Sequence, residues 1–177
     1  MPAKLNSSKI IYKGKVFSFF SDNVTLPNGL TTNIDVIRHP GASAIVPLLN
    51  DNEIILIKQY RYAVGGFIWE IPAGVLDPGE APLECAKREL IEETGYSANE
   101  MEKLTEIVPV PGYSDERIHI FLATGLSESK QNLDDDEILK VHTLKLDAAM
   151  EMIRSGEITD SKTIAGLFLA SQFLDHR

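Results

Sequence analysis

The sequence predicts an α+β fold, in which helices pack on a mixed β-sheet behind a small antiparallel β unit at the N-terminus. Three observations point to this fold. Short segments rich in β-branched and aromatic residues fill the first part of the chain. One strongly helical segment follows near residues 81–94, and further strand-like segments come after it. Two segments with helical spacing of apolar residues end the chain, as expected for helices that cover a sheet.

Length and composition fit a protein with one main domain. The chain has 177 residues, of which 44% are hydrophobic and 24% are charged, which is ordinary for a globular protein with a substantial core. The net charge of −9 argues against a large nucleic-acid interface. A divalent cation could still bridge an acidic site to an anionic ligand.

The sequence shows no sign of export or membrane insertion. The first residues lack the apolar core of a secretory signal, and no apolar run is long enough to span a bilayer. The single cysteine, Cys85, rules out an internal disulfide framework and agrees with a reducing compartment. We therefore expect a cytoplasmic protein without membrane or nucleic-acid partners.

The N-terminal unit is predicted from residues 8–37, which read as short strands separated by turns. The Pro-Asn-Gly sequence at residues 27–29 is typical of a hairpin. We expect residues 1–40 to form a strand unit and residues 41–177 to form the main domain.

The main domain is predicted to alternate between strands and helices. The predicted strands lie at residues 42–49, 53–60, 67–74, 102–110, 116–124 and 138–146, and the predicted helices lie at residues 81–94, 147–155 and 161–174. In the first helix, Pro82 suits the first turn, where its missing N–H costs nothing, and Gly95 suits the C-terminal cap. On a helical projection Leu83, Ala86 and Leu90 share one stripe, which we expect to face the core.

Three carboxylates stand beside this stripe. Glu89, Glu92 and Glu93 form a fan at the edge of the expected buried face. Like charges at these spacings repel one another, and Arg88 can offset only part of the repulsion. A hard divalent cation would offset more, because magnesium prefers oxygen ligands. The alternative is a solvated acidic helix face without a ligand.

The surrounding residues favour the metal interpretation. The segment from Gly74 to Tyr96 resembles the Nudix box, G-x5-E-x7-R-E-U-x-E-E-x-G-U, where U is apolar. All fixed letters are matched, and Tyr96 occupies the last U position. The resemblance implies an α/β/α sandwich whose loop–helix–loop binds Mg²⁺ or Mn²⁺, with two or three ions per site. It also implies hydrolysis of a nucleoside diphosphate linked to another group.

The resemblance assigns roles within the box. The expected metal ligands are the backbone carbonyl of Ala73 and the carboxylates of Glu89, Glu92 and Glu93, and Glu93 is also expected to be catalytic. Bound metal ions would neutralise the pyrophosphate and acidify the attacking water.

Three further residues of the box are expected to support the ligands. Gly74 would let the backbone approach the metal closely, because it has no Cβ. Arg88 would orient the glutamates, and Glu80 would brace the loop or bind an outer metal ion.

The segments that flank the box resemble the ADP-ribose pyrophosphatase branch of the Nudix family. These segments are "IKQYRYAVGGFIWEIPAG" upstream and "VPVPGYSDERIHIFLA" downstream. By this resemblance Arg61 contacts phosphate through its bidentate fork, and Glu70 contacts the substrate or braces a loop. Pro111, Gly112 and Glu116 are expected at the substrate. The alternative for Arg61 is a surface ion pair.

In this branch the general base comes from an acidic loop before a late strand. Here that loop is "SESKQNLDDDEILKVHTL", and the resemblance assigns Glu137 as the base, with Asp135 as its neighbouring alternative. A solvated loop without a catalytic role is the other interpretation.

The sequence thus predicts a magnesium-dependent hydrolase that cleaves ADP-ribose to AMP and ribose 5-phosphate. The resemblance also implies a homodimer that uses the N-terminal strands. GDP-mannose hydrolases share much of the flanking pattern, so hydrolysis of another nucleoside diphosphate sugar or of a dinucleotide is the first alternative. A non-catalytic Nudix ligand-binding module is less favoured, because all the box carboxylates are intact.

Overall fold

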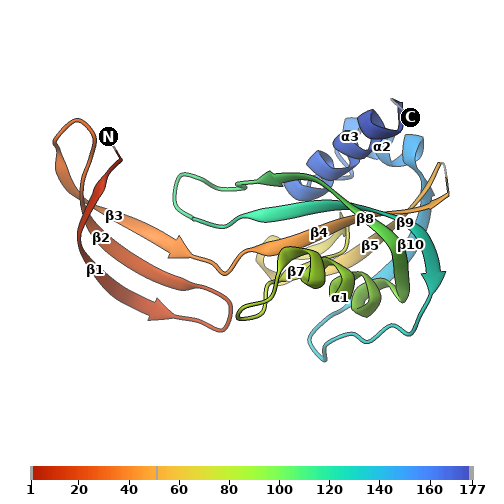
Figure 1. Cartoon of the computed structure of the whole chain (residues 1–177), viewed down its shortest axis with the longest axis horizontal. Coiled ribbons are helices and arrows are strands. Elements are labelled where there is room, and N and C mark those ends of the chain that lie inside the picture. Colours follow the sequence, from red (N-terminus) through yellow and green to blue (C-terminus); the bar gives the residue numbers. More distant parts are fainter. Residues whose placement is uncertain (1, 51, 176–177) are drawn as a thin grey trace.

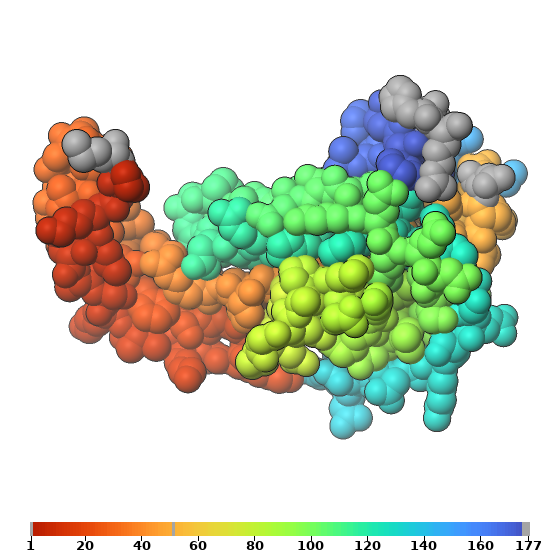
Figure 2. Space-filling view, viewed as in Figure 1, coloured from red at the N-terminus to blue at the C-terminus, as the bar shows by residue number. Residues whose placement is uncertain are grey.

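Two β-sheets organise the chain in the computed structural model, which describes residues 2–50 and 52–175 (Figure 1). The first is a three-stranded N-terminal sheet, and the second is a seven-stranded sheet that carries the helices. The N-terminal sheet extends away from the rest of the chain (Figures 1 and 2).

The N-terminal sheet is an antiparallel meander in the order β1-β2-β3. Its strands are β1 (Lys4–Lys13), β2 (Ser18–Thr25) and β3 (Thr31–Arg38). The predicted hairpin at residues 27–29 is confirmed, with Gly29 at a φ of 87°. All residues of β1 are exposed. The boundary near residue 40 stays a prediction, although the chain passes there from the first sheet to the second.

The main sheet has the order β10-β5-β4-β9-β8, with β6 paired to β5 and β7 paired to β4. Its strands are β4 (Ala42–Asn50), β5 (Glu53–Arg61), β6 (Gly66–Glu70), β7 (Ala73–Val75), β8 (Tyr96–Ile107), β9 (Ile118–Glu128) and β10 (Leu139–Lys145). The sheet is mixed, because β4 runs parallel to β9 and antiparallel to β5. The short 3₁₀ helix η1 (Tyr62–Val64) connects β5 to β6.

Helices cover both faces of the main sheet. The helix α1 (Pro82–Thr94) packs on one face, while α2 (Leu146–Arg154) and α3 (Ser161–Asp175) pack on the other (Figure 1). Alternate side chains of β4 divide between the two cores, since Ile45 faces α1 whereas Ala44 and Val46 face α3. The predicted α/β/α arrangement is confirmed. Within the described residues, no helix has the length and apolar character needed to cross a membrane.

Two strand predictions differ from the structure. Residues 67–74 were expected to form one extended piece, but the structure divides them between β6 and β7. Ile71, between these strands, donates its N–H to Thr163 Oγ1 of α3 at 2.9 Å instead of to a neighbouring strand. The strand expected at residues 102–110 is β8, which begins at Tyr96 and ends at Ile107. Pro109 lies just beyond its end, and a proline has no N–H for a strand ladder.

Candidate active site

The helix α1 places two glutamates on its buried face. Cys85, Ala86 and Leu90 are buried in this face, and so are Glu89, which is 8% exposed, and Glu93, which is 1% exposed. The expectation that Leu83 lies in the core is wrong, since it is 36% exposed. The side of α1 that meets the sheet is rotated toward the glutamates, so Leu83 lies at its margin.

The ends of α1 match the sequence prediction. Pro82 occupies the first helical turn, and Gly95 ends the helix in the left-handed conformation at a φ of 74°. The N–H of Gly95 donates to the carbonyl of Ile91 at 2.9 Å, which closes the last turn. Ser43 of β4 donates its hydroxyl to the carbonyl of Pro82 at 2.7 Å and so fixes the first turn to the sheet.

The short strand β7 packs against the two buried glutamates. The N–H of Ala73 donates to Glu93 Oε2 at 2.8 Å. The Glu89 carboxylate lies directly over Gly74, where an added Cβ would come within 1.8 Å of Glu89 Oε1. Gly74 is therefore required by the close approach of Glu89. Both carboxylates lie between strand and helix instead of at the edge of the buried face.

Burial makes these two carboxyl groups weaker acids than ordinary glutamates. Loss of hydration raises the pKa of Glu89 to about 7 and the pKa of Glu93 to about 8. The negative charge of Glu137 raises both pKa values further. On α1, the charge of Glu92 also raises the pKa of Glu89, and the charge of Glu89 raises the pKa of Glu93. A nearby cation would favour the charged form of both groups.

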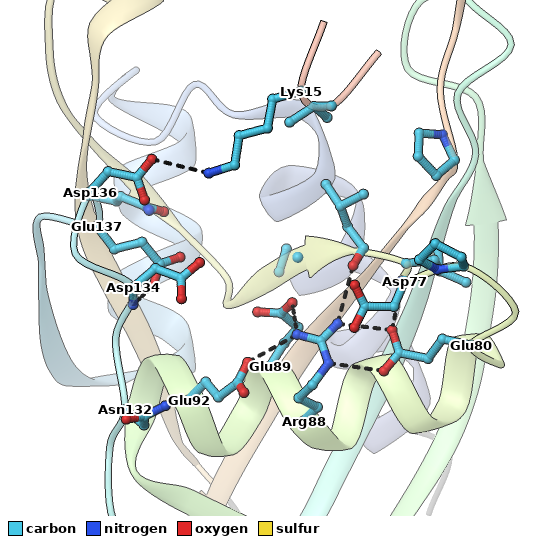
Figure 3. Close-up of a pocket in the computed structure, with 18 of the residues that line it drawn as sticks. Lys15, Asp77, Glu80, Arg88, Glu89, Glu92, Asn132, Asp134, Asp136 and Glu137 are labelled. Carbon is cyan, nitrogen blue, oxygen red and sulfur yellow. Dashed lines mark hydrogen bonds and ion pairs between the residues drawn. The ribbon is translucent and has the colours of Figure 1, made fainter.

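Arg88 links the remaining carboxylates of the box (Figure 3). Its Nε and Nη2 atoms each donate to Glu80 at 2.9 Å, and its Nη1 donates to Glu89 at 2.5 Å and to Glu92 at 3.0 Å. The hydrogen bond from Arg88 holds the pKa of Glu80 near 2. Glu80 also accepts the N–H of Asp77 at 3.0 Å, so it braces the loop before α1.

The donor set fits a hard divalent cation. Within residues 2–50 and 52–175, no three His, Cys, Asp or Glu side chains already converge around one point. Arg88 donates to both Glu89 and Glu92. The available donors are carboxylate and carbonyl oxygens, which Mg²⁺ and Mn²⁺ prefer. Glu93 forms no ion pair with any described lysine or arginine, although it is almost fully buried. An added cation would supply the missing charge.

A cavity of about 780 Å³ opens over Glu89 and Glu92, and Glu93 is not among the residues that line it. Glu89 and Glu92 line one wall, and Asp134, Asp136 and Glu137 line the opposite wall (Figure 3). Glu137 is held in this loop by the N–H of Asp134, which donates to its Oε2 at 3.0 Å. The structure therefore brings Glu137 to the glutamates of α1, whereas Asp135 is not among the residues that line the cavity.

The start of the acidic loop is attached to the end of α1. The N–H of Asn132 donates to the carbonyl of Glu92 at 3.0 Å, and the side chain of Gln131 donates to the carbonyl of Glu93 at 2.6 Å. The N–H of Ser129 donates to the carbonyl of Gly95 at 2.7 Å. These bonds position the following acidic residues across from the box.

A second, smaller cavity of about 350 Å³ lies beside the first and shares Arg61 and residues 73–75 with it. Arg61 forms a fork on Glu70, with Nε at 2.9 Å and Nη2 at 2.7 Å from the two carboxylate oxygens. Lys162 also contacts Glu70 at 2.7 Å. Arg61 therefore reaches the cavities while two of its nitrogens bind Glu70, and its contact with phosphate stays a prediction.

The flanking segment downstream of the box lies partly at the second cavity and partly on the surface. Glu116 lines the second cavity, 3.7 Å from Nδ1 of His39. Pro111 and Gly112 lie in the exposed turn between β8 and β9, and they line neither of these cavities. This turn is tied to the N-terminal sheet, because Ile37 donates its N–H to the carbonyl of Tyr113 at 2.8 Å.

Several residues that line the larger cavity were not predicted from the sequence. Lys15 and Val16 come from the turn between β1 and β2, and Gln59 comes from β5. The amide oxygen of Gln59 is buried and has no hydrogen-bond partner among the described residues. Gln59 lies two residues before Arg61 in the flanking segment, a signal that could have identified it. No motif in the sequence around Lys15 indicates a role at the site, since only the fold brings this residue to the cavity.

Comparison with known proteins agrees with the site. Residues 38–167 match the family model described as the NUDIX domain. A methanol dehydrogenase activator of Bacillus methanolicus is 43% identical over 166 residues, covering 93% of this chain and 88% of that protein. An ADP-ribose pyrophosphatase of Bacillus subtilis is 42% identical over 155 residues, covering 86% and 84%. A GDP-mannose pyrophosphatase of Citrobacter koseri is 36% identical over 181 residues, covering 89% and 93%.

A solved structure has the same fold. The crystal structure of an ADP compounds hydrolase superposes with a TM-score of 0.86 and covers 99% of this chain and 96% of its own. At 24% sequence identity, this similarity speaks for the fold alone.

Proposed function

The chain belongs to the NUDIX family and is a Nudix pyrophosphohydrolase, and from this premise we propose that its substrate is ADP-ribose. Water would cleave the pyrophosphate bond to give AMP and ribose 5-phosphate. The observation that carries the proposal is that Glu89 and Glu92 face an acidic loop across a cavity large enough for a nucleotide, while Glu93 is buried against β7. The similarity to the pyrophosphatase of Bacillus subtilis supports the choice of substrate.

The cofactor in this proposal is Mg²⁺, or Mn²⁺ in its place, with two or three ions at each site. Glu89, Glu92, Glu93 and the carbonyl of Ala73 would hold the metal. Bound there, such an ion neutralises the charge of the pyrophosphate and lowers the pKa of water. Arg88 would keep Glu89 and Glu92 oriented through its hydrogen bonds to them.

The residues of the chain have distinct tasks in the reaction. Glu137 takes a proton from the attacking water, whose oxygen then bonds to one phosphorus atom while the bridging oxygen leaves with the other phosphate. Arg61 binds a phosphate oxygen, and Glu70 keeps the Arg61 side chain in place. Glu116 lies at the second cavity, where it is available to the sugar.

The assignment of the base can be tested with two neighbouring variants. We expect Glu137→Gln to lower kcat at least about a hundredfold, the typical contribution of a positioned base. Asp135→Asn is the matched control and should retain kcat within about twofold, because Asp135 does not line the cavity. The reverse result would make Asp135 the base.

The substrate is tested by hydrolysis of ADP-ribose, GDP-mannose and diadenosine polyphosphates side by side, with Mg²⁺ and with a chelator. We expect the highest kcat/KM with ADP-ribose, with AMP and ribose 5-phosphate as products, and no turnover with the chelator. A preference for GDP-mannose would favour the second candidate, which the relative from Citrobacter koseri supports. Absence of turnover with every compound would favour a ligand-binding module.

We also propose that the protein is a homodimer that uses its N-terminal sheet. The strand β1 exposes apolar residues, among them Ile10, Ile11 and Tyr12, each at least half exposed. Exposed apolar surface of this kind is typical of an interface. The mass in solution, measured by light scattering, should be that of two chains, and Ile10→Glu should shift it toward that of one chain.

A further inference from the structure

The turn between β1 and β2 reaches the larger cavity from the N-terminal sheet. This turn is closed by the N–H of Gly14, which donates to the carbonyl of Phe17 at 2.9 Å. Lys15 and Val16 project from it and line the same cavity as Glu89 and Glu137. In Figure 3 the Lys15 side chain extends across the cavity toward the acidic loop. The N-terminal sheet is therefore part of the wall of the site.

Lys15 has a weak partner in this position. Its Nζ lies 3.7 Å from Oδ2 of Asp136, and the two side chains are 85% and 77% exposed. Exposed pairs of this kind contribute little stability, because water screens both charges. Asp136 directly precedes the candidate base Glu137.

The other cations of the cavity are held by buried or half-buried carboxylates. Among residues 2–50 and 52–175, three basic residues line the cavity, namely Lys15, Arg61 and Arg88. Arg88 binds three glutamates at 2.5 to 3.0 Å, and Arg61 binds the buried Glu70. Lys15 alone has only an exposed partner, so it can move to a ligand at the lowest cost. Acidic residues outnumber basic ones along this lining.

We propose that Lys15 is a substrate-binding residue, whose ammonium group leaves Asp136 to bind a phosphate of the nucleoside diphosphate. The inference rests on the proposed function, since it assumes an anionic pyrophosphate substrate. A flexible ammonium group with three donors suits the phosphate anion. In a cavity whose lining has more acidic than basic residues, this cation reduces the repulsion that the substrate meets on entry. The N-terminal sheet thus contributes to the substrate site of its own chain.

The test compares Lys15→Met with Asp136→Asn in steady-state hydrolysis of ADP-ribose. Lys15→Met should raise KM about tenfold and leave kcat within about twofold, because it removes a contact made in both ground and transition states. Asp136→Asn should lower KM about twofold, because it frees Lys15 for the substrate. In the double variant Asp136→Asn should have no further effect. Lys13→Met, a lysine on exposed β1 that does not line the cavity, is the control and should leave both constants unchanged.

The opposite changes in KM distinguish a Lys15 that binds substrate from a Lys15 that only holds the acidic loop in place. If Lys15 acted only by holding Asp136, both variants would break the same contact and change KM in the same direction, which would overturn the proposal. An unchanged KM in Lys15→Met would also overturn it. Lys15→Arg should retain most of the affinity, since it keeps the charge.

A binding measurement keeps this test independent of the proposed function. Calorimetric titration with α,β-methylene ADP-ribose should give a Kd about tenfold weaker for Lys15→Met than for the wild type. If the wild type preferred another nucleoside diphosphate sugar, the choice of ADP-ribose would fail. The same variants would then be compared on that sugar nucleotide, where unequal KM effects of opposite sign would still support Lys15 and equal effects would exclude it.

Discussion

Among the described residues, two glutamates are almost completely buried, and they differ in the cations that contact them. Glu70 is 2% exposed and Glu93 is 1% exposed. Burial by itself raises the pKa of either carboxyl group. Arg61 and Lys162 contact Glu70 at 2.7 Å, and together they bring its pKa below the ordinary value. Glu93 receives one backbone N–H and keeps a pKa of about 8.

The difference shows which carboxylate is structural and which one requires a ligand. A buried charge is costly unless a partner offsets the lost hydration. The chain supplies two cations to Glu70, so this group is satisfied without any ligand. It supplies none at ion-pair distance to Glu93 among the described residues, and Glu89 and Glu137 add negative charge nearby. Glu93 is therefore the group that an external cation would stabilise most.

The largest expected effect comes from neutralising Glu93. Glu93→Gln should lower kcat about a thousandfold or more, because it removes a ligand of the metal that activates the reaction. Stability without metal should stay about equal at pH 7, since a pKa of about 8 leaves Glu93 mostly protonated there and the amide can still accept the N–H of Ala73. Steady-state kinetics and thermal unfolding measure the two effects. Glu84→Gln, on the exposed side of α1, is the control and should change neither quantity. Wild-type rates in Glu93→Gln would remove the metal assignment.

Neutralising Glu70 should lower the stability of the fold, which neutralising Glu93 should not. Glu70→Gln leaves Arg61 and Lys162 without their counter-charge, so the free energy of unfolding should fall by about 3 kcal/mol. The lower end of the usual range applies because Arg61 is partly exposed and can be hydrated. Urea unfolding measures the change. Glu151→Gln, in an exposed pair with Arg154, should cost less than about 0.5 kcal/mol. Equal stability of Glu70→Gln and the wild type would show that the two cations do not depend on Glu70.

Metal binding should distinguish the two glutamates directly. Mg²⁺ at a hundred times its Kd should stabilise the wild type by about 2.7 kcal/mol, because only the folded chain assembles the ligands. Glu70→Gln should retain this gain, and Glu93→Gln should lose most of it. Thermal unfolding with and without Mg²⁺ measures the gain, with Ca²⁺ as a test of ion selectivity. A gain that persists undiminished in Glu93→Gln would place the ion elsewhere.

The sequence could predict the features that depend on local spacing. The carboxylates of the box share one helix, so their offsets alone determine that they stand together. The caps at Pro82 and Gly95 depend on backbone chemistry and were also predictable. The exposure of Leu83 was not, because it depends on which side of the helix the sheet covers.

Features that depend on the packing of distant segments escaped the sequence analysis. Lys15 and Asp136 are far apart in the sequence, and only the orientation of the N-terminal sheet brings them together. The contact of Lys162 with Glu70 likewise depends on how α3 packs against β6. The turn that holds Pro111 lies beside the N-terminal sheet, and its contact with the substrate stays a prediction.

The smallest expected effect concerns Glu80, whose carboxylate is paired by the chain itself, as that of Glu70 is. The hydrogen bond from Arg88 lowers its pKa from 4.5 to about 2. The stabilisation is therefore complete above pH 4.5 and is lost as the pH falls toward 2. Glu80→Gln should cost about 1.5 kcal/mol at pH 7, the size of a hydrogen bond to a charged group. Urea unfolding should show this difference narrowing as the pH is lowered from 6 to about 3.5. A constant difference over this range would mean that Glu80 contributes by packing and not by its charge.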